Sequence, residues 1–225
     1  MSSFLMIYIM LIAVLIYGRL HQCAEHYNNI VECLGKQNDI NFFFSSDNSP
    51  ESLVNDFITL YKPILYNNNP IHYDSYLEKY PGINIQTNDH SITCHFMNKN
   101  RVFSLLEEYI NKESIQYDVI VSMRIDCIFH NNFIFNNLED NTVYIPVDGD
   151  YGGINDQIAY GKVDVMKKYN SINIIELLDK KLTYMLHPET LTLVNINFNN
   201  LLIKRVDLQY KLDRVDMRYQ PYRKW

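Results

Sequence analysis

Three features that would assign a function class at once are missing from this chain of 225 residues. The four cysteines include no CxxC pair and no metal-finger spacing, so we expect buried thiols at Cys23, Cys33, Cys94 and Cys127. The formal net charge of -6 comes without long acidic runs, which argues against a protein that grips nucleic acid along a basic surface. No internal repeat or long low-complexity tract stands out. We therefore expect no nucleic-acid partner.

The sequence also lacks an apolar run long enough to cross a membrane. A spanning helix needs about 20 apolar residues, whereas the run from Phe4 to Tyr17 is shorter and has no Lys or Arg before it. A signal peptide would show a basic start and a small-residue cleavage site, and neither is visible. Ile12–Tyr17, rich in β-branched residues and closed by Gly18, instead predicts a buried parallel strand. Residues 1–10 then form a hydrophobic extension, with a weak membrane anchor as the alternative.

Length and a hydrophobic content of 47% fit a single domain over residues 1–225. Short apolar runs predict strands at 12–17, 40–44, 118–123, 142–147 and 201–212. Helical spacing or N-cap chemistry predicts helices at 20–34, 49–60, 100–110, 155–169 and 188–194, with loops over 67–82. A basic, aromatic tail, 214–225, closes the chain. The alternation of elements indicates an α/β protein with a mostly parallel sheet flanked by helices.

Arg124 and Asp126 directly follow one of the predicted strands. In an open α/β sheet, ligands gather beyond the carboxyl ends of the strands, so both residues stand where chemistry is expected. Asp126 is a candidate ligand for a divalent cation that stabilises a leaving diphosphate. Arg124 can pair with phosphate or hold the Asp126 carboxylate through a bidentate contact. A purely structural Arg–Asp salt bridge is the alternative interpretation.

The segment Gly152–Gly161 is the second candidate. Its first two glycines allow a close backbone approach, and polar side chains follow them at the start of the predicted helix. Asp156 and Gln157 would present hydrogen-bonding groups to sugar hydroxyls, and Asp156 can also serve as a base or electrostatic partner for an acceptor. In the alternative interpretation, Asn155 is only an N-cap and the glycines are only a turn.

Together these segments resemble the GT-A-like glycosyltransferases of the kind found in large DNA viruses and as uncharacterised domains in cellular genomes. The resemblance runs through most of the chain and is carried by Ile12–Arg19, Tyr61–Pro63, Tyr117–Asp126, Gly152–Gln157 and His187–Glu189. It implies a GT-A-like fold. It also implies transfer of a sugar from a nucleoside-diphosphate donor to a glycan or protein acceptor, assisted by Mn²⁺ or Mg²⁺.

The resemblance implies which residues bind the donor. The turn after the first strand would contact nucleotide or phosphate through Gly18 and Arg19, and Arg124 would join them. The donor sugar or the acceptor would lie against the later polar turn, formed by Gly152, Gly153, Asn155 and Gln157.

The resemblance also implies the catalytic and metal-binding residues. Asp156 and Glu189 would be the catalytic carboxylates. An Arg-x-Asp motif would stand in for the better-known Asp-x-Asp, so Asp126 would hold the cation and His187 would complete its shell. A single aspartate supplies few ligands for a metal ion, and the pair Asp148 and Asp150 is the alternative metal site. His187 is otherwise a helix cap or a packing residue.

Two other functions remain open, and the incomplete carboxylate motif motivates the first. One is a non-catalytic binding or assembly protein with the same fold. The other is a membrane-associated protein held by Phe4–Tyr17 and the basic tail. With no spanning segment expected, we predict a cytoplasmic location, which for a viral protein means the host cytoplasm or the virion.

Overall fold

A computed structural model describes residues 9–20, 26–72, 79–80, 82–85, 89–183 and 185–213. The extension before Ile9, the tail 214–225 and the start of the first predicted helix, 21–25, lie outside these ranges. Within them, no helix is both long enough and apolar enough to cross a membrane.

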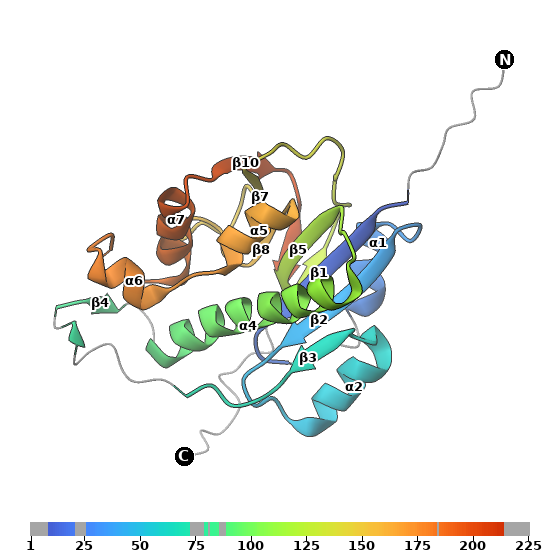
Figure 1. The fold of residues 1–225 in the computed structure, drawn as a ribbon, viewed down its shortest axis with the longest axis horizontal. Helices are drawn as coiled ribbons and strands as arrows, with labels where there is room; N and C mark the ends of the chain where they lie inside the picture. The colour runs from blue at the N-terminus through green and yellow to red at the C-terminus, as the bar shows by residue number, and fades with distance from the viewer. Residues whose placement is uncertain are drawn as a thin grey trace.

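A seven-stranded sheet forms the middle of the molecule, in the order β10-β7-β8-β5-β1-β2-β3 (Figure 1). The strands are β1 Leu11–Tyr17, β2 Asp39–Ser45, β3 Leu65–Asn67, β5 Val119–Arg124, β7 Thr142–Pro146, β8 Ile158–Gly161 and β10 Leu202–Val206. β8 runs antiparallel to β5 and β7, and the other neighbouring pairs are parallel. The predicted α/β class with a mostly parallel sheet is confirmed.

β1 lies inside the sheet because its side chains are apolar on both faces, as expected for a parallel strand covered on two sides. Residues 12 to 16 are all 0% exposed. Ile12, Val14 and Ile16 belong to the core formed with α1 and α2. Ala13 and Leu15 belong to the core formed with α4 and α5. The result is a three-layer arrangement of helices, sheet and helices.

The helices on the first face are α1 Tyr27–Leu34 and α2 Glu51–Tyr61. On the second face lie α4 Asp89–Glu113 and α5 Val163–Asn170. The amino-terminal half of α4 extends past the sheet and packs in a smaller core with α6 Ile174–Asp179 and α7 Pro188–Phe198 (Figure 1). Two small sheets complete the fold, pairing β4 Asn84–Ile85 with β9 Met185–Leu186 and β6 Cys127–Phe129 with β11 Tyr210–Leu212.

The helix predicted over 155–169 is wrong in its first half. Residues 158–161 form strand β8, and α5 begins only at Val163. The four β8 residues are buried between β5 and β7, so pairing with two strands prevails over the helical spacing of the apolar residues. Asn155 is therefore not a helix N-cap.

Other predicted boundaries also differ. The helix predicted from residue 100 already begins at Asp89, and the late strand at 201–212 is two strands in different sheets. Pro50, not Ser49, precedes the first residue of α2 as its N-cap, and the Ser49 hydroxyl accepts a hydrogen bond from the Leu20 amide. Residue 67, predicted as the start of a loop, ends β3.

Candidate functional site

The strand order reverses beside β1, and the candidate site lies at this reversal. From β1 the sheet grows through β2 to β3 on one side and then through β5 on the other. Tyr17, the last residue of β1, pairs in register with Ser45 of β2 and Arg124 of β5. The carboxyl ends of three strands therefore lie side by side, at the kind of switch point where open α/β sheets bind ligands.

A cavity of about 670 Å³ opens beyond these strand ends. Ligand pockets in proteins commonly span about 300 to 1,000 Å³, so the space is adequate for a nucleotide or a sugar. Four residues singled out in the sequence line it together: Gly18, Arg19, Arg124 and Asp126. The loop after β2 and one side of α4 supply further wall residues, among them Asp47, Asn48, His90, Ser91, Cys94, His95 and Asn98.

The turn after β1 gives the cavity an accessible backbone and a cation. Gly18 has a φ of +106°, and a side chain at this position would meet no atom within 4 Å. Its amide donates to the Ser45 carbonyl oxygen at 3.0 Å, which holds the turn against β2. Arg19, the next residue, is exposed. The turn thus places a positive charge beside a stretch of backbone that no side chain covers.

Arg124 and Asp126 form a bidentate ion pair on the cavity wall. Arg124 Nε lies 2.8 Å from Asp126 Oδ1, and Nη2 lies 2.6 Å from Oδ2. Burial lowers the pKa of Arg124, but the Asp126 carboxylate outweighs burial and leaves the pKa above its ordinary value. Asp126 is only 3% exposed, and both of its oxygens accept from Arg124. The Arg124 Nη1 nitrogen takes no part in this pair.

The Gly152–Gln157 segment lies beside the cavity, and its residues are absent from the described wall. Asn155 is 0% exposed and makes hydrogen bonds to the Asp148 carbonyl oxygen, the Tyr210 hydroxyl and the Gln157 amide. Gln157 accepts from Tyr210 as well. A Cβ on Gly153 would come within 2.2 Å of the Glu189 backbone. The side chains of Asn155 and Gln157 are therefore engaged within the protein, and Gly153 packs tightly against the start of α7.

Asp156 reaches the cavity only indirectly. Its carboxylate is 3.0 Å from Nε2 of His95, whose ring lines the cavity, while Asp156 itself is 3% exposed. Burial raises the pKa of Asp156, but His95, Lys99 and Arg124 outweigh it and leave the pKa lowered. The hydroxyl of Tyr17 donates to the Asp156 carbonyl oxygen at 2.7 Å, which ties this loop to the end of β1.

Lys99 lies behind this pair and was not anticipated from the sequence. It is 0% exposed, and its Nζ has no hydrogen-bond partner among the described residues. The Nζ atom sits 4.1 Å from the centre of the Tyr169 ring and 5.4 Å from that of Tyr17. Burial lowers the pKa of Lys99 to about 7, against the attraction of Asp156.

His187 and Glu189 lie apart from the described wall. His187 Nδ1 is 2.9 Å from Glu189 Oε2, so the two residues pair with each other at the start of α7. Asp150 is likewise engaged, because both of its oxygens contact Arg205 and one accepts from the Asn155 amide. The structure does not bring His187, Glu189 or Asp150 together with Asp126.

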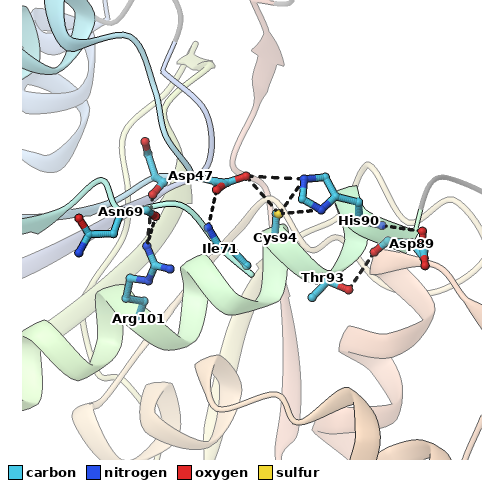
Figure 2. Close-up of polar contacts among 9 residues, drawn as sticks. Asp47, Asn69, Ile71, Asp89, His90, Thr93, Cys94 and Arg101 are labelled. Atoms are coloured by element: carbon cyan, nitrogen blue, oxygen red, sulfur yellow. Dashed lines mark hydrogen bonds and ion pairs between the residues drawn. The ribbon is translucent and has the colours of Figure 1, made fainter. Parts of the chain in front are cut away.

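Within the described ranges, the only group of three donor side chains suited to a metal is Asp47, His90 and Cys94 (Figure 2). All three line the cavity. Burial, and then Asp47, raise the pKa of the Cys94 thiol to about 12. The sequence contained a signal, since His90 and Cys94 are four residues apart, but the helix was predicted to begin only at residue 100.

Comparison with known proteins identifies the fold. A family model described as Domain of unknown function (DUF7796) matches residues 94–222, and no curated protein matches the sequence significantly. An active-site mutant of LgtC is 13% identical, with a TM-score of 0.50 over 87% of this chain and 72% of that chain. The galactosyltransferase LgtC in complex with donor and acceptor sugar analogs is 14% identical, with a TM-score of 0.50 over 87% and 73%. This likeness shows the expected GT-A-like fold.

Proposed function

This chain belongs to the DUF7796 family, a domain of unknown function, and we propose that it is a glycosyltransferase which takes its sugar from a nucleoside-diphosphate donor. The observation that carries the proposal is the cavity at the switch point with Arg19 and Arg124 on its wall. Guanidinium groups recognise phosphate through charge-assisted, often bidentate hydrogen bonds. The likeness to LgtC, solved with donor and acceptor sugar analogs, supports this choice of ligand.

The diphosphate of the donor binds at the turn after β1 and at the end of β5. Arg19 is exposed there, and the Gly18 backbone can be approached closely because no side chain covers it. Arg124 is held in place by Asp126 through two of its nitrogens, which leaves Nη1 to face a phosphate oxygen. In this arrangement Asp126 acts as a positioning residue for Arg124.

A Mn²⁺ or Mg²⁺ ion held by Asp126 and His187 does not fit these contacts. Both oxygens of Asp126 accept from Arg124, and His187 pairs with Glu189 away from the described cavity wall. Of the alternative pair, Asp150 is bound to Arg205. We therefore propose that Arg19 and Arg124 neutralise the diphosphate. The experiment below measures donor binding with and without metal.

We place the acceptor near His95. Its ring lines the cavity, and the Asp156 carboxylate stands directly behind it at 3.0 Å. A buried carboxylate in this position fixes the orientation of an imidazole and favours the charge that forms when the ring takes a proton. Asp156 is thus proposed to act through His95 as a positioning residue and not by touching the sugar.

Binding of nucleotide sugars to the purified chain tests the proposal. We expect at least one nucleoside-diphosphate sugar in a panel to bind by calorimetry and to be hydrolysed or transferred, with and without Mn²⁺. Arg19→Ala should weaken binding about tenfold, which corresponds to about 1.4 kcal/mol. Arg205→Ala is the matched control because this arginine pairs with Asp150 outside the described wall. Absence of binding by every donor in both conditions would refute the proposal.

Asp156→Asn tests the catalytic arrangement separately. It should lower kcat at least tenfold and leave KM nearly unchanged, because Asp156 does not line the donor cavity. An equal loss in KM with kcat preserved would assign Asp156 to ligand binding instead.

A non-catalytic binding protein with the same fold is the second candidate, and two observations favour it. Arg124 and Asp126 are tied to each other, and Asn155 of the Gly152–Gln157 segment bonds to Tyr210 and Gln157. This candidate predicts that a nucleotide sugar binds without hydrolysis or transfer to any acceptor in a sugar panel, and that Asp156→Asn leaves this binding unchanged.

A further inference from the structure

Three donor atoms of different chemistry lie close together in the side chains of Asp47, His90 and Cys94 (Figure 2), which all line the cavity. Cys94 Sγ lies 3.3 Å from Asp47 Oδ2 and 3.5 Å from His90 Nε2. The remaining pair, His90 Nε2 and Asp47 Oδ2, is 3.8 Å apart. A thiol, an imidazole and a carboxylate therefore lie within 4.8 Å of one another.

These separations match the spacing of ligands around a tetrahedral zinc ion. Zn–S bonds of about 2.3 Å and Zn–N and Zn–O bonds of about 2.0 to 2.1 Å put neighbouring ligand atoms about 3.3 to 3.6 Å apart. Two of the observed distances fall in that range, and the third exceeds it by a few tenths of an ångström. The third involves the exposed side chain of His90, and Cys94 Sγ also lies 3.7 Å from His90 Nδ1, so metal binding requires the ring to rotate and aim Nε2 at the ion.

The scaffold holds the three residues in this arrangement. His90 and Cys94 are one helical turn apart on α4, so their side chains project from the same face of the helix. Asp47 Oδ1 accepts from the Ile71 amide at 2.7 Å, which orients the carboxylate and directs Oδ2 toward the sulfur. Outer contacts of this kind commonly orient the ligands of metal sites.

We propose that Asp47, His90 and Cys94 bind Zn²⁺, with the fourth coordination position open to the cavity. All three residues line the cavity, so a water or a substrate atom can occupy that position. Three protein ligands and an open fourth position are the pattern of catalytic and regulatory zinc sites. A thiolate and an imidazole select zinc over Mg²⁺ or Mn²⁺, which prefer oxygen ligands.

The same contacts have a simpler explanation, in which the Cys94 thiol donates to Asp47 and no metal binds. The two explanations differ in what happens when metal is supplied to the folded chain. The zinc site does not depend on the proposed glycosyltransferase activity, and its test measures metal binding alone.

The test uses the full chain after dialysis against a chelator, with Co²⁺ as a spectroscopic substitute for Zn²⁺. One equivalent of Co²⁺ should produce a sulfur-to-metal charge-transfer band, and Zn²⁺ should then displace it. Cys94→Ser should abolish the band, whereas Cys33→Ser should retain it, because Cys33 is a buried thiol on α1. No band in the folded wild type, or an undiminished band in Cys94→Ser, would overturn the proposal.

Two further variants keep the test decisive if Cys94→Ser does not fold. Asp47→Asn preserves the acceptor for the Ile71 amide, and His90→Gln changes an exposed side chain, so both should fold. Each should weaken Zn²⁺ binding at least tenfold in competition with a chromophoric chelator. Unchanged affinity in both variants would place the metal elsewhere and end the proposal.

Discussion

The cavity wall and the Gly152–Gln157 segment are both polar stretches next to strand ends, yet their side chains are used differently. On the wall, Arg19 is exposed to the cavity and Gly18 leaves the backbone open. In the segment, Asn155 is fully buried and its amide bonds to neighbouring loop and strand groups. We therefore propose that the first region serves a ligand, whereas the polar side chains of the second stabilise the fold.

Gly153→Ala should have the largest effect. A methyl group there would come within 2.2 Å of the Glu189 backbone, which cannot move without shifting α7, so we expect a loss of about 3 kcal/mol in the free energy of unfolding. Gly152→Ala is the control. Its added Cβ meets no atom within 4 Å, and only its positive φ costs about 1 kcal/mol. Urea unfolding measures both, and equal losses would show that close packing at Gly153 is unimportant.

Asn155→Ala should follow, with a loss of about 2 kcal/mol, because the Gln157 amide and the Asp148 carbonyl would lose a buried partner. The exposed Asn197 offers a comparison, and its replacement by alanine should change stability by less than about 0.5 kcal/mol. If Asn155→Ala proved as stable as wild type but bound nucleotide sugars poorly, the segment would belong with the cavity wall.

Lys99→Met should change the pH dependence of stability. The pKa of Lys99 is about 7 in the folded chain and 10.5 ordinarily, so between these values the unfolded chain binds more protons. The free energy of unfolding of the wild type should therefore be larger at pH 9 than at pH 7. The slope due to Lys99 is about 1 kcal/mol per pH unit and should disappear in Lys99→Met.

Neighbouring titratable groups could also contribute to the change of unfolding free energy with pH that we assign to Lys99. Tyr17, Tyr169, His95 and Asp156 face it from β1, α5, α4 and the loop before β8. Burial raises the pKa of both tyrosines above the ordinary value, so neither ionises in this range. Identical slopes for wild type and Lys99→Met, measured by urea unfolding, would contradict the assignment.

Arg19→Ala should have the smallest effect on the fold. An exposed side chain at the cavity rim can be removed at a cost below about 0.5 kcal/mol, even though donor binding should weaken about tenfold. Thermal unfolding and calorimetry on the same preparation separate the two quantities. A large loss of stability would mean that Arg19 supports the structure, and the contrast between the two regions would disappear.

The sequence predicts the centre of the fold well because that part is dominated by burial. Ile12–Tyr17 is a continuous apolar run and 118–123 is mostly apolar, and both are inner strands of the sheet. The four-residue β8 was missed because its identity depends on partners on both sides. A run of four apolar residues does not distinguish a short strand from the start of a helix.

Some residues of the candidate site could be predicted from the sequence, and others could not. Gly18, Arg19, Arg124 and Asp126 follow strands that the sequence reveals, and all four reach the cavity wall. Asp47, His90, Cys94 and His95 come from a loop and from the half of α4 over which no helix was predicted. Polar residues interrupt the helical spacing of Ile92 and Phe96 there, so only the folded chain shows that these side chains meet.

The central place of β1 also governs the order in which the chain can fold. The Leu11 amide donates to the Asp118 side chain across 107 positions of sequence, at the start of the pairing between β1 and β5. A ribosome therefore releases an apolar strand long before its second neighbour exists. Contacts between such distant segments form slowly, and an unpaired apolar strand edge can join that of another chain. Until β5 emerges, we expect the free edge of β1 to be the segment of the nascent chain most prone to aggregation.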